Sequence, residues 1–157
     1  MNELLHIEQD KDFPDKFYGI ITSIKDNNNI NFLDYENNIY SYINNKMRFP
    51  FYFGIIPQTY IEDGPLSFIF FSENQYSILT KIKLEPSFFI KVPTGEAVLN
   101  IVFSEVNSKI IINKDNIKNI LEEFFNEEIS IINNAKNILI NANNEYHRKY
   151  VKIIKKL

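Results

Sequence analysis

Residues 49–68 read Phe-Pro-Phe-Tyr-Phe-Gly-Ile-Ile-Pro-Gln-Thr-Tyr-Ile-Glu-Asp-Gly-Pro-Leu-Ser-Phe, a stretch dense in aromatic residues, prolines and glycines. Proline and glycine interrupt regular strand pairing, so residues 47–64 are predicted to be irregular. The apolar run that follows predicts a strand at residues 66–71, of which residues 68–71 are buried on both faces. The aromatic rings ahead of it are expected mainly in the core or at a subunit interface.

Short β-branched and aromatic runs, separated by turn residues, continue on both sides of this stretch. On the N-terminal side they predict strands at residues 18–24, 30–35 and 39–43, joined by Asn-rich turns into hairpins. Residues 1–16 read as a polar lead-in that ends near Pro14. Further strands are predicted at residues 77–83, 88–92, 98–103 and 109–112.

The hydrophobic period changes from two residues to 3.6 after Asn113. A first helix is predicted at about residues 114–126, with Asn113 as its N-cap. A second is predicted at about residues 131–156, with Ser130 as its N-cap. Strands that precede helices predict a mainly β fold with C-terminal helices (α+β), in the form of a small barrel or sandwich flanked by those helices.

Length and composition indicate one domain and exclude several kinds of functional site. The 157 residues fit one domain, which we place at residues 17–157 with its barrel at about 17–112. The chain has no cysteine and two histidines, which excludes disulfides, Cys-based metal sites and a multi-His metal site within one chain. No apolar run approaches the ~18 residues of a membrane span, and the first residues do not resemble a secretory signal. A cytoplasmic protein that does not enter the membrane is therefore expected.

The stretch at residues 49–68 resembles the signature region of family I soluble inorganic pyrophosphatases. In that family a Tyr-Pro-x-Asn-Tyr-Gly-x-Ile-Pro-x-Thr segment leads into Asp-Gly-Asp-Pro-x-Asp. The resemblance extends loosely over residues 17–128 and includes the pair Phe124-Phe125. It implies an OB-like five-stranded barrel, a homo-oligomer, and Mg²⁺-dependent hydrolysis of pyrophosphate by a carboxylate cluster that holds several cations.

Most positions that the resemblance assigns to metal or phosphate binding carry other residues. The first Asp of the acidic motif is present as Asp63, the second is deleted between Gly64 and Pro65, and the third falls on Ser67. The remaining matched positions of the family's site fall on Ser23, Asn31, Ile43, Phe53, Val92, Ala97, Leu99, Glu128 and Ile129. Carboxylates and cations are lost together, as expected once the metals are gone, because either sign left buried alone costs several kcal/mol.

The leading hypothesis is therefore a pyrophosphatase-like pseudoenzyme that acts as a scaffold or a binding module, with a small phosphate as a candidate ligand. Asp63 is the single matched metal ligand, and Mg²⁺ is the cation expected there if binding or activity remains. The competing interpretation of Asp63 is an acid that caps local amides in a turn. A second hypothesis keeps a working Mg²⁺-dependent diphosphatase, with rearranged ligands drawn from Glu62, Asp63, Glu73, Glu96 and Glu105.

A third hypothesis is an OB-like module that binds nucleic acid or protein. Phe49 and residues 51–53 would supply a stacking platform, and residues 145–157, with a net charge of +4, would supply cations. The remaining 144 residues carry −7, which disfavours nucleic acid because a phosphate-binding groove is positive. His6 and His147 are expected to be solvated, and the basic C-terminus also fits the favourable dipole at a helix end.

Overall fold

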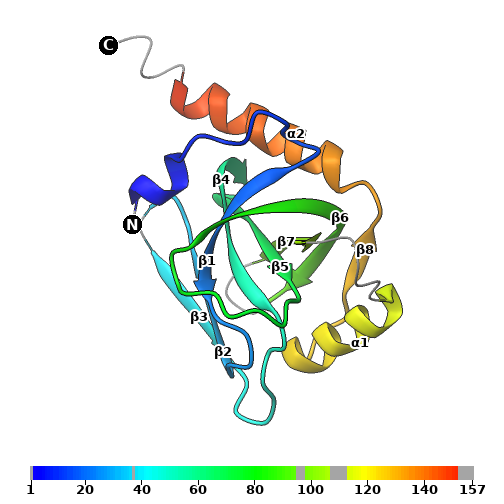
Figure 1. The fold of residues 1–157 in the computed structure, drawn as a ribbon. Helices are drawn as coiled ribbons and strands as arrows, with labels where there is room; N and C mark the ends of the chain where they lie inside the picture. Colours follow the sequence, from blue (N-terminus) through cyan, green and yellow to red (C-terminus); the bar gives the residue numbers. More distant parts are fainter. Residues whose placement is uncertain (1, 37, 95–97, 107–112, 152–157) are drawn as a thin grey trace.

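The computed structural model describes residues 2–36, 38–94, 98–106 and 113–151. Figure 1 shows a strand barrel with helices on its outside. The strands are β1 (Phe17–Ser23), β2 (Asn29–Leu33), β3 (Ile39–Ile43), β4 (Tyr52–Ile61), β5 (Gly64–Phe70), β6 (Lys81–Pro93), β7 (Val98–Glu105) and β8 (Ser130–Ile132). The helices are the short η1 (Asn2–His6), α1 (Lys114–Phe125), α2 (Ala135–Tyr146) and η2 (His147–Val151), the last with π-helical bonding.

Within the described residues the barrel is a closed ring of five strands, in the order β1-β4-β5-β7-β6 and back to β1. The pair β5–β7 is parallel, and the other neighbours in the ring are antiparallel. Because strand β6 is long, two different strands pair with it along one edge. Its residues 81–84 pair with β1, and its residues 89–91 pair with β8. This ring confirms the mainly β fold with C-terminal helices that the sequence predicts and the five-stranded barrel that the family resemblance implies.

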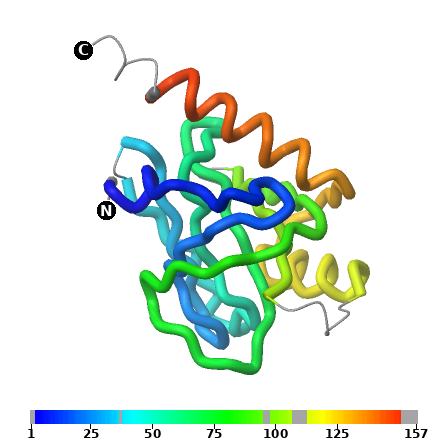
Figure 2. The backbone as a smooth tube through the Cα atoms, turned by 45° about the horizontal axis from the view of Figure 1, so that its top comes forward, coloured from blue at the N-terminus to red at the C-terminus, as the bar shows by residue number. Residues whose placement is uncertain are grey.

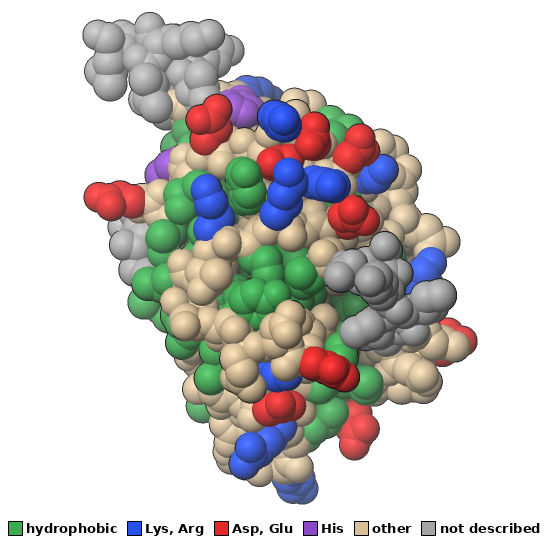
Figure 3. Space-filling model, in the orientation of Figure 1, with side chains coloured by type: hydrophobic (Ala, Val, Ile, Leu, Met, Phe, Trp, Pro, Cys, Tyr) green, Lys and Arg blue, Asp and Glu red, His purple; other side chains and the backbone are tan. Residues whose placement is uncertain are grey.

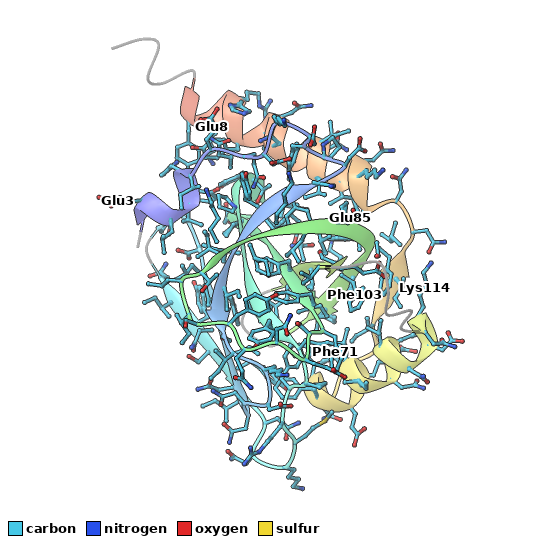
Figure 4. All side chains as sticks on the ribbon, viewed as in Figure 1. Glu3, Glu8, Phe71, Glu85, Phe103 and Lys114 are labelled. Atoms are coloured by element: carbon cyan, nitrogen blue, oxygen red, sulfur yellow. The ribbon has the colours of Figure 1, made fainter. Side chains whose placement is uncertain are left out.

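The apolar residues of the ring pack against the helices on two sides. On one side Phe103 and Phe88 stack with centroids 4.9 Å apart, in the cluster that contains Phe124 and Phe125 of α1. Figure 4 shows Phe103 between the sheet and α1. On the other side the α2 face that includes Leu139 is buried against β4 and β6. The prediction of the first helix and its N-cap is confirmed. The helix is α1, and the side chain of Asn113 accepts the main-chain N–H of Asp115.

The prediction of an irregular segment at residues 47–64 is wrong, because most of it is strand β4. The register between β4 and β5 breaks between Ile56 and Ile61, so Pro57 needs no ladder bond there. Gln58 takes a left-handed backbone conformation in this bulge. The hydroxyl of Thr59 donates to the Ile56 carbonyl and accepts the Leu66 amide, which replaces the missing strand bonds.

Two other boundaries differ from prediction. The strand expected at residues 77–83 begins only at Lys81, because residues 77–80 form a turn. The N-cap assigned to Ser130 is wrong: Ser130 begins β8, and α2 starts after Asn134, which accepts the Asn137 amide. The strand predicted at residues 109–112 and the end of the second helix beyond residue 151 lie outside the described residues.

The predicted polar lead-in is packed against the domain. Leu5 is buried among barrel residues, and the buried carboxylate of Asp10 lies 3.2 Å from the ammonium of Lys83. Asp15 forms an ion pair with Lys136 of α2. Figures 1 and 2 both show this segment running beside α2. In the part of the chain that the structure describes, no helix has the length and apolar character needed to cross a lipid bilayer.

Candidate functional site

A pocket of about 400 Å³ lies where three segments of the chain meet. The β2–β3 hairpin, the β4–β5 turn and the beginning of β7 supply its walls. Among the residues that line it are Asp34, Asn38, Tyr40, Glu62, Asp63, Ser67, Leu99 and Asn100. Polar groups from three segments therefore converge on one concave surface, which is the usual form of a ligand site.

The carboxylate of Asp34 is hydrogen-bonded within the β2–β3 hairpin. It accepts the backbone amides of Glu36 and Asn38, both at 2.9 Å, and the Tyr40 hydroxyl at 3.0 Å. Partial burial alone would raise the pKa of Asp34, but these hydrogen bonds outweigh burial and lower it. The oxygens of Asp34 thus hold the turn of the hairpin in shape.

Glu62 is engaged by β6 and β7. One carboxylate oxygen lies 3.0 Å from the Lys91 ammonium, and the other accepts the Asn100 side-chain amide at 3.2 Å. The hydrogen bond from Lys91 is the main cause that lowers the pKa of Glu62. This cation and amide occupy positions from which a metal ion would otherwise approach the carboxylate.

Asp63 lies beside Glu62 in the two-residue turn between β4 and β5. Both residues have positive φ, 47° for Glu62 and 69° for Asp63, as turns that join twisted antiparallel strands require. The Asp63 carboxylate accepts the Tyr60 hydroxyl at 3.0 Å, and that hydroxyl accepts a hydrogen from Lys149 at 2.7 Å. Asp63 is therefore an exposed turn residue with a local partner.

No protein-family model and no curated protein sequence matches the chain. Solved structures do. The inorganic pyrophosphatase from Thermus thermophilus matches with a TM-score of 0.70 at 15% identity, covering 91% of this chain and 98% of that one. The Helicobacter pylori enzyme gives 0.70 at 18% (90% and 98% covered), and the Neisseria gonorrhoeae enzyme gives 0.69 at 16% (93% and 98% covered). The chain has the inorganic pyrophosphatase fold.

The pyrophosphatase fold brings some of the matched positions together and separates others. Asp63, Ser67 and Leu99 all line the pocket. Ser23 and Asn31 lie side by side, and the main-chain N–H of Asn31 donates to the Ser23 hydroxyl at 2.8 Å. The remaining described positions lie elsewhere: Phe53, Val92 and Ile129 are buried in the core, and Ile43 and Glu128 are exposed. Ala97 lies outside the described residues.

The pocket does not fit the cation cluster that the pyrophosphatase resemblance implies. Within residues 2–36, 38–94, 98–106 and 113–151, no three His, Cys, Asp or Glu side chains lie close enough to hold a metal ion. Mg²⁺ needs several oxygen ligands in near-octahedral geometry, and Asp34 and Glu62 already bind donors of the chain itself. Of the other candidate ligands, Glu73 and Glu105 do not line the pocket, and Glu96 lies outside the described residues.

Two residues of the site escape sequence reasoning. Lys91 of β6 reaches the carboxylate of Glu62, and Asn100 of β7 reaches the same carboxylate and lines the pocket. Neither residue matches a motif position. The side-chain oxygen of Asn100 is buried without a hydrogen-bond partner among the described residues. A single polar residue inside the apolar run at residues 98–103 is the signal that would have identified it.

The stacking platform of the third hypothesis is wrong in this fold. Phe49 and all three residues 51–53 are buried in the core, so their faces are not available to bases. Figure 3 shows acidic and basic side chains interspersed on its upper part, without a continuous positive stripe on the visible face. His6 is exposed, in agreement with the prediction that it is solvated. It contacts the Tyr146 hydroxyl through its Nδ1 at 2.5 Å and packs against Tyr35 and Tyr150.

Proposed function

We propose that this protein is a divergent family I inorganic pyrophosphatase that has lost hydrolytic activity and serves as a scaffold or binding module. The observation that carries the proposal is the engagement of Glu62 by Lys91 and Asn100. A carboxylate that already accepts hydrogen bonds from an ammonium and an amide is a weakened ligand for a hard cation, which must compete with both donors.

Electrostatics supports the same conclusion. The rim of the pocket carries Asp34, Glu36, Glu62 and Asp63, and Lys91 offsets one of these charges. Pyrophosphate is a multiply charged anion that binds where cations compensate it. Among the described residues the pocket has excess negative charge and no group of side chains that could hold several metal ions, so it repels such a substrate. Asp63 alone offers at most a weak site for one hydrated Mg²⁺.

The test is phosphate release from pyrophosphate by the purified full chain, with Mg²⁺, with Mn²⁺ and without metal. We expect no release above a no-protein control, in a sample shown to be folded by circular dichroism. Turnover at an ordinary enzymatic rate of ~1–10³ s⁻¹ would overturn the proposal. If Asp63→Asn abolished that turnover, the second hypothesis, a diphosphatase with rearranged ligands, would be established instead.

Binding is measured separately from turnover. Calorimetric titration with Mg²⁺, inorganic phosphate and pyrophosphate distinguishes a binding module from a scaffold without a small ligand. A scaffold requires partners, and we propose that the first partner is a second copy of the chain, because homo-oligomers are expected by resemblance to the family. A cytoplasmic location is part of the same proposal.

A further inference from the structure

Strand β3 has a free edge. Among the described residues it pairs only with β2. The main-chain N–H and C=O of Asn31 in β2 bond to Ser23 and Thr22 of β1, at 2.8 and 3.0 Å, so these groups point away from β3. Asn31 lies opposite Ser41, which makes this a pair without mutual hydrogen bonds. By the alternation of an antiparallel ladder, the main-chain groups of Ile39, Ser41 and Ile43 therefore point outward.

The outer face of β3 is apolar. The side chains of Ile39 and Ile43 are 61% and 56% exposed, whereas Tyr40 and Tyr42 pack against the core from the opposite face. Strand edges in natural proteins are usually guarded by Lys, Pro or a bulge, since an unguarded edge pairs with another chain. Strand β3 has none of these guards. In Figure 1 it lies at the outer margin of the molecule.

The sequence of this edge is self-complementary. Residues 38–44 read Asn-Ile-Tyr-Ser-Tyr-Ile-Asn, the same in both directions. Two antiparallel copies centred on Ser41 place Ile39 of one beside Ile43 of the other. Each residue whose main-chain groups point outward then lies opposite another such residue in the second copy. These residues form hydrogen-bonded pairs, with about six main-chain hydrogen bonds in all. A two-fold interface requires a surface that matches itself in this way.

Charge is complementary in the same register. Acidic residues, Asp34 and Glu36, precede β3, and basic residues, Lys46 and Arg48, follow it. An antiparallel arrangement places the acidic end of each copy at the basic end of the other. A parallel arrangement would place like charges together, so charge selects the two-fold pairing.

We propose that two copies of this chain dimerise by antiparallel pairing of β3 with β3 about a two-fold axis at Ser41. The occupant of the free edge is a second copy because the strand matches itself in side chains, hydrogen-bonding positions and terminal charge. The contact is short, so the dimer is expected to form reversibly with concentration. Its measurement does not depend on whether pyrophosphate is bound or hydrolysed.

The matched test compares Ser41→Pro with Ser41→Ala by sedimentation velocity of the full chain. Both variants lose the hydrogen bond from the Ser41 hydroxyl to Asn31. Only proline also removes an outward N–H. Over about a hundred-fold concentration range, native protein and Ser41→Ala should dimerise, and Ser41→Pro should need at least about ten-fold more protein. A monomer throughout, or a dimer that Ser41→Pro leaves unchanged, would overturn the pairing.

A second variant keeps the test decisive if Ser41→Pro does not fold. Ile43→Lys alters an exposed side chain and places a charge beside Ile39 of the other copy, so it should weaken the dimer without unfolding the monomer. Cross-linking reports the register directly. The chain has no cysteine, so Ser41→Cys introduces one thiol per copy at a Cα separation of about 5.5 Å across the axis. It should oxidise to a covalent dimer faster than Ile140→Cys on α2, and equal rates would contradict the register.

Discussion

Substitution of Asn100 measures how much a buried polar residue of the pocket lowers the free energy of unfolding. The Asn100 side chain is only 5% exposed, and its amide oxygen has no partner among the described residues. A buried acceptor left unpaired costs about 1–3 kcal/mol. Leucine has the same branched arrangement of side-chain heavy atoms and no polar atom. We therefore expect Asn100→Leu to remove this cost.

The opposing term is the hydrogen bond from Asn100 to Glu62. A bond to a charged group can contribute about 1.5–3 kcal/mol, but the Glu62 side chain is 46% exposed, so water can replace the lost donor and the loss is ~1 kcal/mol or less. The net expectation is a gain of about 1 kcal/mol in the free energy of unfolding. For a domain of this size that gain raises Tm by about 2–4 °C.

The assay is urea unfolding followed by far-ultraviolet circular dichroism, with an unchanged m-value as evidence of an unchanged native state. Asn100→Asp is the matched control, because it keeps the shape and adds a negative charge beside Glu62. It should destabilise the protein at neutral pH, because burial beside Glu62 raises the pKa of the introduced carboxyl. The deficit should shrink as the pH falls toward the unfolded Asp pKa of about 4, where that carboxyl is protonated in the folded state. An Asn100→Leu protein that is less stable than the native one would refute the reasoning, since the oxygen would then have a stabilising partner.

Three further predictions concern the barrel and the segments packed on it. A methyl group at Gly54 would lie 2.1 Å from the Ile20 carbonyl oxygen, so Gly54→Ala should lose about 3 kcal/mol or more, or fail to fold, as thermal unfolding will show. The buried Tyr52 hydroxyl donates to one backbone carbonyl and accepts one backbone amide of the next loop, so Tyr52→Phe should cost about 1–3 kcal/mol in urea unfolding. Burial would raise the pKa of Asp10, but a backbone amide and the Lys83 ammonium lower it overall. The stability it contributes is present above its unfolded pKa of about 4 and is lost as the pH falls, and Asp10→Asn should flatten this acid limb in unfolding curves.

The sequence predicts those parts of the fold that local patterns control. Strand β3 and the helix after Asn113 lie where their periodicity and caps place them. Strand β4 was missed because Pro57 normally argues against a strand, and only the bulge opposite β5 makes it acceptable. Helix α2 begins later than predicted because Ser130 pairs with β6, a contact that no local window contains.

The candidate site was predictable only in part, for a similar reason. Asp63, Ser67 and Leu99 were placed by resemblance, and the fold does bring them to one pocket. The partners of Glu62, by contrast, come from positions about thirty and forty residues further along the chain. An ion pair between a turn and a distant strand leaves no sequence pattern of its own. Geometry alone identifies it.

The pairing of β1 with β6 has a consequence for how the protein is made. The ring closes only when residues 17–20 meet residues 81–84 and β7, which follows β6 in the chain, pairs with both β5 and β6. The hairpins β2–β3 and β4–β5 have shorter connections. A chain still on the ribosome with β6 inside the exit tunnel can form the hairpins β2–β3 and β4–β5. It cannot yet enclose the apolar side chains that those strands share. Closure is then a single late event, and the half-made chain is the state that a chaperone would protect.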